Sequence, residues 1–259
     1  FLFRRAFLFK LITMNLPQTP HHQPSHDLDY PTVWIMILGL IIAIGPLSID
    51  MYLPALPSMA KDFGVATAFM SNSVPAYFVG LVVGQLFYGP ISDRIGRIKP
   101  LYVGMVLYVI ASVMCATTTN EYVLFVSRTL QALGACVGTV VSRAMIRDRL
   151  HPKQMAKAFS LMVLVMGIAP ILAPSLGSLL LKVASWRVIF WFLAGFGILN
   201  IVLTRLFLHE TLTDEFRNNR PMNDVLSQYW DLLKDTQFNY PAIGAGPVSY
   251  THLRAHETR

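Results

Sequence analysis

The stretch Gly89–Pro100 reads GPISDRIGRIKP and lies between two long apolar runs, Ser73–Tyr88 and Leu101–Thr118. It contains the carboxylate of Asp93 and a group of three fixed cations: Arg94, Arg97 and Lys99. A short basic link between two membrane spans must lie at a membrane face, and Lys and Arg concentrate on the cytoplasmic side. The stretch therefore predicts the ends of the two spans that flank it, and it predicts the orientation of the chain.

The composition predicts a membrane protein. Of the 259 residues, 54% are hydrophobic and only 14% are charged, whereas soluble domains have about 25% charged residues. The net charge of +7 does not indicate a nucleic-acid partner, because the cations lie in short links and form no compact basic face. Cys115 and Cys136 fall inside apolar runs without the spacing of metal ligands, so we expect buried free thiols and no metal site.

Six apolar segments have about the 20 residues that a spanning helix needs. They occupy approximately residues 33–56, 73–92, 101–118, 122–145, 158–181 and 187–208. The predicted fold is an all-α membrane protein in which residues 33–208 form a six-helix transmembrane bundle. Alternate links are rich in Lys and Arg, whereas the others hold only Lys61, Lys182 and Arg187. We therefore expect a cytoplasmic amino terminus and a cytoplasmic segment after the sixth helix.

The flanking segments differ from the spans in composition. Residues 1–32 are predicted to be a cytoplasmic lead, with Met14 interpreted as the natural start and residues 1–13 as upstream translation. Residues 209–238 are polar and are predicted to be a cytoplasmic linker. At 239–259 a further apolar run begins and stops, which we interpret as the truncated start of a seventh helix followed by a non-native tail.

One acidic residue lies inside the first apolar run. Asp50 belongs to GPLSIDMYLPALP, and Pro46 and Pro54 lie four residues away on either side. An ionised carboxylate in lipid is unfavourable, so the side chain should face the bundle interior or a water-filled cavity. The prolines free backbone groups beside it. A carboxyl group that gains and loses a proton there is a candidate for proton coupling. The alternative is an interfacial acid near the outer end of the helix.

A basic residue lies inside the fourth apolar run, which contains RTLQALGACVGTVVSRAMIRD. Arg128 needs an acceptor or water at this depth. Asp50 is expected at a comparable depth, and Gln131 follows Arg128 at i+3 on nearly the same helix face. We therefore group Asp50, Arg128 and Gln131 as candidates for coupling protons to substrate. The alternative is that Arg128 extends to the outer headgroups.

Small and polar residues mark faces of the other spans. The spacings of Gly80 with Gly84 and of Gly134 with Gly138 predict close helix packing. The fifth span carries a kinked face of small residues, for which packing is the better explanation on physical grounds alone: Gly167, Pro170, Pro174 and Gly177. Candidate cavity-lining residues, for which ordinary packing is the alternative, are Tyr52, Asn72, Tyr77 and Gln85.

Charged residues at the cytoplasmic ends of the spans can pair across the links. Arg97 can pair with Asp148, and Asp93 with Arg147 or with a helix amino terminus. Such pairs would hold one conformation and break in another. The residues expected to form this conformational latch are Gly89, Asp93, Arg94, Gly96, Arg97, Arg147 and Asp148. The alternative is a solvated charge cluster that only sets the topology.

Two of these motifs resemble those of the major facilitator superfamily. The spacing Gly-x-x-x-Asp-Arg-x-Gly-Arg-x-Lys-Pro resembles the signature loop between its second and third helices, with Ile98 where a basic residue is more usual. Arg128 and Gln131 resemble its fourth-helix motif Arg-x-x-Gln-Gly-x-Gly, with Ala132 in place of the first glycine.

A third motif and several longer runs extend the resemblance. Gly167, Pro174 and Gly177 align with the antiporter motif Gly-x-x-x-Gly-Pro-x-x-Gly-Gly, with Ala173 and Ser178 in place of glycines; in the family this motif distinguishes exchangers from symporters. The runs SIDMYLPALP, RDRLHPKQMAKAFSLMVLVMGIAPILAP, ASWRVIFWFLA and HETL resemble the drug:proton antiporters of the bicyclomycin and chloramphenicol resistance (Bcr/CflA) type. The resemblance covers about residues 33–212.

The resemblance implies two six-helix halves, each a 3+3 inverted repeat, with a binding cavity between them. This chain would be the amino-terminal half and would need the missing carboxy-terminal half. The implied activity is proton-coupled export of small amphipathic drugs by alternating access across the bacterial inner membrane, with the drug, protons and the lipid bilayer as partners. The alternatives are a uniporter or symporter for small metabolites, or an inactive truncated fragment.

An enzyme is not expected. No His lies between positions 27 and 150, and the spans contain no cluster of acids that could bind a metal. The phosphate-binding pattern Gly-x-x-x-x-Gly-Lys-Ser/Thr is absent from the sequence. We therefore expect no cofactor and no ATP-driven step.

Overall fold

The computed structural model describes residues 32–213, and all regular structure in that range is helical. The elements are α2 (Thr32–Asp50), η1 (Leu53–Ala55), α3 (Leu56–Phe63), α4 (Thr67–Met70), α5 (Ser73–Ile95), α6 (Ile98–Thr117), α7 (Glu121–Arg149), α8 (Pro152–Val183) and α9 (Arg187–Phe207). Within the described range, six segments are long and apolar enough to cross a membrane, which confirms the predicted fold class. The predicted lead, the tail and the linker beyond residue 213 lie outside the described residues.

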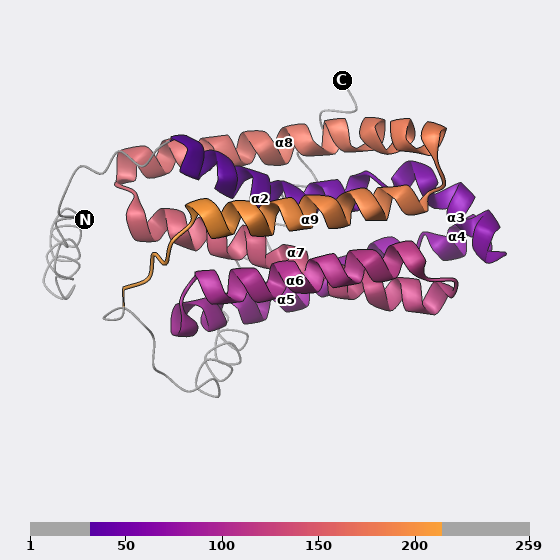
Figure 1. Cartoon of the computed structure of the whole chain (residues 1–259), viewed down its shortest axis with the longest axis horizontal. Helices are drawn as coiled ribbons and strands as arrows, with labels where there is room; N and C mark the ends of the chain where they lie inside the picture. The colour runs from indigo at the N-terminus through magenta and orange to yellow at the C-terminus, as the bar shows by residue number, and fades with distance from the viewer. Residues whose placement is uncertain (1–31, 214–259) are drawn as a thin grey trace, which may run out of the picture. The chain divides into compact units, whose positions relative to one another are not determined.

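The long helices run side by side, with α7 in contact with several others (Figure 1). Helix α7 packs against α5, α6 and α2, while α2 also packs against α8 and α9, and α6 packs against α9. Two short links, at 96–97 and at 150–151, join α5 to α6 and α7 to α8. These links and the end of α9 lie at the same end of the bundle, where Arg97 contacts Asp148 and Arg149 contacts Glu210.

The first span is broken, which the predicted continuous segment 33–56 did not include. Helix α2 ends at Asp50, and the chain then forms a turn, η1 and α3 before Gly64 ends α3 with a φ of 68°. Pro54 and Pro57 are the second residues of η1 and α3. A proline has no N–H to continue the preceding helix but fits the first turn of a new one. The proline spacing therefore breaks the span beside Asp50.

Glycines allow the helices to approach closely, as the small-residue spacing predicted. A Cβ atom on Gly80 would overlap the Thr129 carbonyl oxygen, and one on Gly134 would lie 2.6 Å from the Gly104 carbonyl oxygen. Similar close contacts surround Gly84 and Gly138, so the packing prediction for both pairs is confirmed. In these positions any side chain would push α7 away from its neighbours.

Several helices are longer than the apolar runs that predicted them. Helix α7 continues to Arg149 rather than to residue 145, and α8 begins at Pro152 rather than at residue 158. The Arg and Lys residues at these ends are good helix formers, and they extend the helices beyond the segment that hydrophobicity marks. At the other end of α7, the Asn120 side chain caps the helix by accepting hydrogen bonds from the backbone N–H groups of Tyr122 and Val123.

Candidate functional site

Arg128 lies on α7 and is completely buried. Its Nη1 donates to Gln131 Oε1 at 2.6 Å, and its Nη2 donates to the backbone oxygen of Ser48 at 2.9 Å. Ser48 is in the last turn of α2, where the carbonyl groups lose their helical partners because the helix stops. Arg128 therefore binds the broken end of α2 through the backbone.

Three aromatic rings surround the Arg128 guanidinium group. Its Cζ lies 4.1 Å from the ring centre of Tyr52, 4.4 Å from that of Tyr77 and 5.7 Å from that of Phe190. The negative faces of aromatic rings stabilise a cation that has been removed from water. Tyr52 and Tyr77 were candidates for lining a cavity, and the structure places both fully buried against Arg128.

A chain of hydrogen bonds continues from Arg128 to α6. Gln131 Nε2 donates to Ser112 Oγ at 2.8 Å, and Ser112 Oγ donates to the Tyr108 carbonyl at 2.7 Å. The Tyr108 and Ser48 hydroxyl groups are 2.7 Å apart and share a hydrogen bond. These contacts close a loop through α2, α6 and α7. We call the set Ser48, Tyr52, Tyr77, Tyr108, Ser112, Arg128, Gln131 and Phe190 the Arg128 cluster.

Asp50 lies beside the Arg128 cluster but is not bonded to it. It is the last residue of α2, two positions after Ser48, and its side chain is partly exposed. Among residues 32–213, no ion pair involves either Asp50 or Arg128. The structure therefore differs from the expected arrangement: Arg128 takes a backbone carbonyl of α2 as its acceptor rather than the Asp50 carboxylate.

The predicted small-residue face of α8 reaches the same break in one place. A Cβ atom on Gly177 would overlap the Met51 carbonyl oxygen, which directly follows Asp50. Gly167 has nothing within 4 Å of the corresponding position, and Pro170 and Pro174 lie inside the continuous helix α8. The other two candidates for lining a cavity, Asn72 and Gln85, are exposed.

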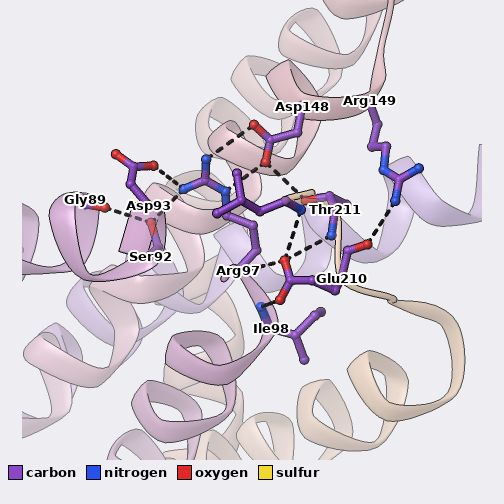
Figure 2. A network of polar contacts seen from close by, with 10 residues as sticks. Gly89, Ser92, Asp93, Arg97, Ile98, Asp148, Arg149, Glu210 and Thr211 are labelled. Carbon is purple, nitrogen blue, oxygen red and sulfur yellow. Dashed lines mark hydrogen bonds and ion pairs between the residues drawn. The ribbon is translucent and has the colours of Figure 1, made fainter. Parts of the chain in front are cut away.

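A second polar group lies at the end of the bundle that carries the α5–α6 turn (Figure 2). Arg97 is only 5% exposed. Its Nε donates to Asp148 Oδ2 at 2.8 Å, and its Nη2 lies 3.3 Å from Asp148 Oδ1. Its Nη1 donates to Ser92 Oγ at 2.9 Å and to the Asp93 carboxylate. Arg97 thus joins the end of α5 to the end of α7 through a charge-assisted, two-point contact.

The other residues of the expected latch have different positions. Asp93 pairs with Arg97 rather than with Arg147, which is exposed and forms no ion pair within the described range. Arg94 is also exposed. The Gly89 carbonyl accepts a hydrogen bond from Ser92 Oγ at 2.9 Å. Gly96 has a φ of 97°, which a residue with a side chain rarely adopts.

Glu210 completes this second group, although the sequence did not single it out as a site residue. Its carboxylate accepts hydrogen bonds from the backbone N–H groups of Arg97 and Ile98, at 2.8 and 3.2 Å. It also accepts from the N–H groups of Thr211 and Leu212, at 3.0 and 3.1 Å. The only signal in the sequence is its place in HETL, directly after the last span. We call Ser92, Asp93, Gly96, Arg97, Ile98, Asp148, Arg149, Glu210 and Thr211 the Arg97 cluster.

Burial and hydrogen bonding act in opposite directions on the charges of the Arg97 cluster. Burial alone would raise the pKa of Glu210, but the four backbone donors outweigh burial and hold the pKa below its ordinary value. Burial alone would lower the pKa of Arg97, but Asp148 and Asp93 outweigh it and raise that pKa. The cluster therefore keeps both groups ionised at neutral pH.

The opposite end of the bundle carries a smaller polar contact. Asp62, near the end of α3, accepts a hydrogen bond from Trp186 Nε1 at 3.0 Å and pairs with Arg187. Arg187 Nη2 also donates to the Thr118 carbonyl at 3.3 Å. These contacts attach α3 to the start of α9 and to the α6–α7 link.

The fold and the two clusters define a class of protein: a multi-pass helical membrane protein with a buried cation at a broken span and a charged contact between helix ends. Residues 36–248 match the model of the Major Facilitator Superfamily. The match covers most of the chain, so the chain belongs to this family of membrane transporters.

Individual relatives agree with the family. The chain is 39% identical over 212 residues to "Uncharacterized MFS-type transporter YdgK" of Bacillus subtilis (strain 168), covering 81% of this chain and 53% of that protein. It is 36% identical over 159 residues to "Multidrug resistance protein D" of Escherichia coli (strain K12), with 61% and 40% covered. It is 36% identical over 187 residues to "Multidrug resistance protein MdtL" of Escherichia fergusonii, with 70% and 48% covered. The chain thus spans about half the length of the curated relatives it matches.

A solved structure supports the fold. The crystal structure of the human organic anion transporter MFSD10 (TETRAN) aligns with a TM-score of 0.60 at 17% identity, covering 75% of this chain and 52% of that one. At this identity the likeness concerns the fold alone.

Proposed function

We propose that the complete protein is a proton-coupled multidrug efflux antiporter and that this chain is its amino-terminal half. Its substrates would be small amphipathic drugs, exported by alternating access across the bacterial inner membrane. Two of the relatives are named multidrug resistance proteins, and the chain covers 40% and 48% of them. The observation that carries the proposal is the partly exposed residue Asp50 at the end of α2, two positions after the Ser48 carbonyl that the buried cation of Arg128 binds.

Asp50 is the group that would exchange protons. It belongs to a segment that is apolar enough to cross the membrane, and it is partly exposed; the proposed exchange requires that water reach it during the cycle. An ionisable residue at membrane depth marks an ion or substrate pathway by default. In the proposed cycle, a proton binds the Asp50 carboxylate when the site opens outward and leaves when it opens inward. Drug leaves the site on the outward-open side, so export of the drug is exchanged for entry of protons.

Contacts of the backbone on both sides of Asp50 can couple its protonation to the positions of two other helices. Arg128 on α7 binds the Ser48 carbonyl just before it, and Gly177 on α8 touches the Met51 carbonyl just after it. Protonation of Asp50 changes the electrostatic field at the Ser48 and Met51 carbonyls, which α7 and α8 contact. This arrangement supports coupling between protonation and helix movement without a direct ion pair between Asp50 and Arg128.

The Arg97 cluster is the proposed latch. It joins α5 and α7 at one end of the bundle through Arg97, Asp93 and Asp148. Charged pairs at a membrane face can form in one conformation and dissociate in another, because water and headgroups are available to the separated charges. The surplus of Lys and Arg at this end supports a cytoplasmic location, with the amino terminus on the same side.

The decisive test replaces Asp50 in the complete protein. Inverted vesicles with an acidic lumen are supplied with ethidium as the amphipathic cation, and both ethidium uptake and lumenal pH are followed. The wild type should take up ethidium and release protons, and Asp50→Asn should lose both. Asp62→Asn is the matched control, because it neutralises a carboxylate at the outer end of the same span. Drug-dependent proton release that persists in Asp50→Asn would contradict the proposal.

The same assay separates the other transport mechanisms. Ethidium uptake without a change in lumenal pH would indicate a uniporter. Loss of ethidium from preloaded vesicles together with protons would indicate a symporter. Either result in the wild type would replace the antiporter proposal while leaving the family unchanged.

A further inference from the structure

The segment that follows α9 is attached to the α5–α6 turn by a single carboxylate. Glu210 accepts the N–H groups of Arg97 and Ile98, which begin α6 and therefore have no acceptor within that helix. The same carboxylate accepts the N–H groups of Thr211 and Leu212 in its own segment. Figure 2 shows Glu210 between the two pieces of backbone.

Two further contacts attach this segment to α7. Thr211 Oγ1 donates to Asp148 Oδ2 at 3.2 Å, the same oxygen that accepts Arg97 Nε. Arg149 Nη2 donates to the Glu210 carbonyl at 2.9 Å. Leu208, Thr211 and Leu212 are each less than 10% exposed, so the segment packs into the bundle end rather than extending away from it.

The shape of the α5–α6 turn depends on this carboxylate. Gly96 adopts a φ of 97°, and a Cβ atom there would overlap the Glu210 carboxylate. The Glu210 carboxylate therefore packs directly against the backbone of Gly96. Since the Arg97 N–H is one of the bonded groups, the position of Glu210 sets the backbone from which the Arg97 side chain extends.

From this geometry we propose that Glu210 is a positioning residue. It fixes the Gly96–Ile98 turn so that Arg97 faces Asp93 and Asp148, and it makes the segment Leu208–Thr213 part of the latch. When the latch opens, this segment is released with it, so the position of Leu208–Thr213 depends on whether the Arg97 cluster is closed or open. Only the role in the transport cycle rests on the proposed function; the positioning role is a property of the structure.

Amide hydrogen exchange in the complete protein tests the positioning role directly. The Arg97 and Ile98 amides have Glu210 as their acceptor, so Glu210→Ala should increase their exchange rates about tenfold, the effect of losing a hydrogen bond to a charged acceptor. Glu210→Gln keeps a neutral acceptor and should give a smaller increase. Glu210→Asp keeps the charge on a shorter side chain and should restore part of the protection.

The controls separate a local effect from general unfolding. Asp62→Asn removes a paired carboxylate at the opposite end and should leave exchange at Arg97 and Ile98 unchanged. Exchange within α7 should remain at the wild-type rate in each variant. If Glu210→Ala does not fold, Glu210→Gln decides the outcome. Unchanged rates at Arg97 and Ile98 in the folded variants, or an equal increase throughout the protein, would overturn the proposal.

A transport measurement then tests whether the positioning acts through Arg97. Glu210→Gln should lower the maximal rate of efflux and leave the apparent KM within about twofold, because the change affects a conformational step and not substrate contacts. The double variant Glu210→Gln with Asp148→Asn should be no slower than Asp148→Asn alone. If the two substitutions reduced the efflux rate independently, so that their separate fold-changes multiplied in the double variant, Glu210 would not act through the Arg97–Asp148 contact. If the wild type shows no proton-driven efflux, the proposed function fails while the exchange result still decides the role of Glu210.

Discussion

The Arg97 cluster and the Arg128 cluster each contain a buried arginine, but the two arginines have different kinds of partner. Arg97 is bonded to two carboxylates, Asp93 and Asp148. Arg128 is bonded to an amide oxygen and a backbone carbonyl and is enclosed by aromatic rings. The carboxylates neutralise the charge of Arg97, whereas the partners of Arg128 are uncharged and leave its positive charge in place.

The difference follows from where the two arginines lie. At the end of the helices, separated charges regain water, so an ion pair there can open at a smaller free-energy cost than an ion pair inside a span. Inside a span, an unpaired carboxylate or guanidinium group is far more expensive, so a partner that must dissociate is a poor choice. Backbone and amide acceptors remain in place in every conformation that keeps the helices together. The Arg97 cluster is therefore suited to opening, and the Arg128 cluster is suited to staying closed.

Exchanging arginine for lysine in each cluster gives the largest predicted contrast. Arg128→Lys cannot reach both acceptors and lie flat against the rings, so we expect a loss of ~2–4 kcal/mol in unfolding free energy and loss of transport. Arg97→Lys loses the two-point contact with Asp148 but keeps a cation between two carboxylates, so it should lose less, ~1–1.5 kcal/mol. Thermal unfolding of the complete protein in detergent measures both variants. Equal losses in the two variants would remove the distinction between the clusters.

Helix α8 offers a matched pair of glycines for a second, smaller effect. Gly177→Ala would place a methyl group against the Met51 carbonyl, so α8 and the break of α2 must separate, at a cost of ~1–3 kcal/mol. Gly167→Ala meets nothing within 4 Å, and because alanine is the better helix former it should leave stability unchanged or raise it by up to ~1 kcal/mol. Unfolding temperatures of the two variants give the comparison. A Gly177→Ala variant as stable as Gly167→Ala would show that the break does not depend on close contact with α8.

Sequence patterns could predict the spans and the central arginine of each cluster, but only some of the other cluster residues and some of the contacts. Hydrophobicity and glycine spacing were sufficient for the six spans and for close packing at Gly80 and Gly134, because both depend on properties that repeat along a helix. The acceptor of Arg128 could not be predicted, because it is a backbone carbonyl that becomes available only where α2 breaks. A pattern of side chains therefore suggested Asp50 as the partner.

Glu210 was missed for a related reason. Its partners are four N–H groups of the backbone, and two of them belong to a turn more than a hundred residues earlier in the chain. No spacing of charged residues indicates such a contact. The signal that does exist is a short polar motif directly after a span, which composition alone assigns to a linker.

The smallest predicted effect concerns the pH dependence of the Arg97 cluster. The folded protein holds the pKa of Glu210 below its ordinary value of 4.5, because four N–H donors outweigh the effect of burial. As the pH falls, the unfolded chain therefore binds this proton before the folded protein does. The stability that Glu210 contributes is complete above a pH of about 4.5 and is lost as the pH falls through the lower, folded pKa.

The side chain of Gln in the variant Glu210→Gln has no group that titrates in this range. The wild type should therefore be more stable than the variant by a constant amount near neutral pH, and this difference should shrink in acid. Unfolding temperatures of both proteins across this range measure the difference. In Arg128→Lys the lost stability should not return in acid, because the acceptors of Arg128 are an amide and a backbone carbonyl that do not titrate. An advantage over Glu210→Gln that stays constant or grows in acid would mean that the carboxylate is not held in its ionised form. In that case the stability of the Arg97 cluster would not depend on an ionised Glu210, and in this respect the cluster would resemble the Arg128 cluster, whose acceptors are uncharged.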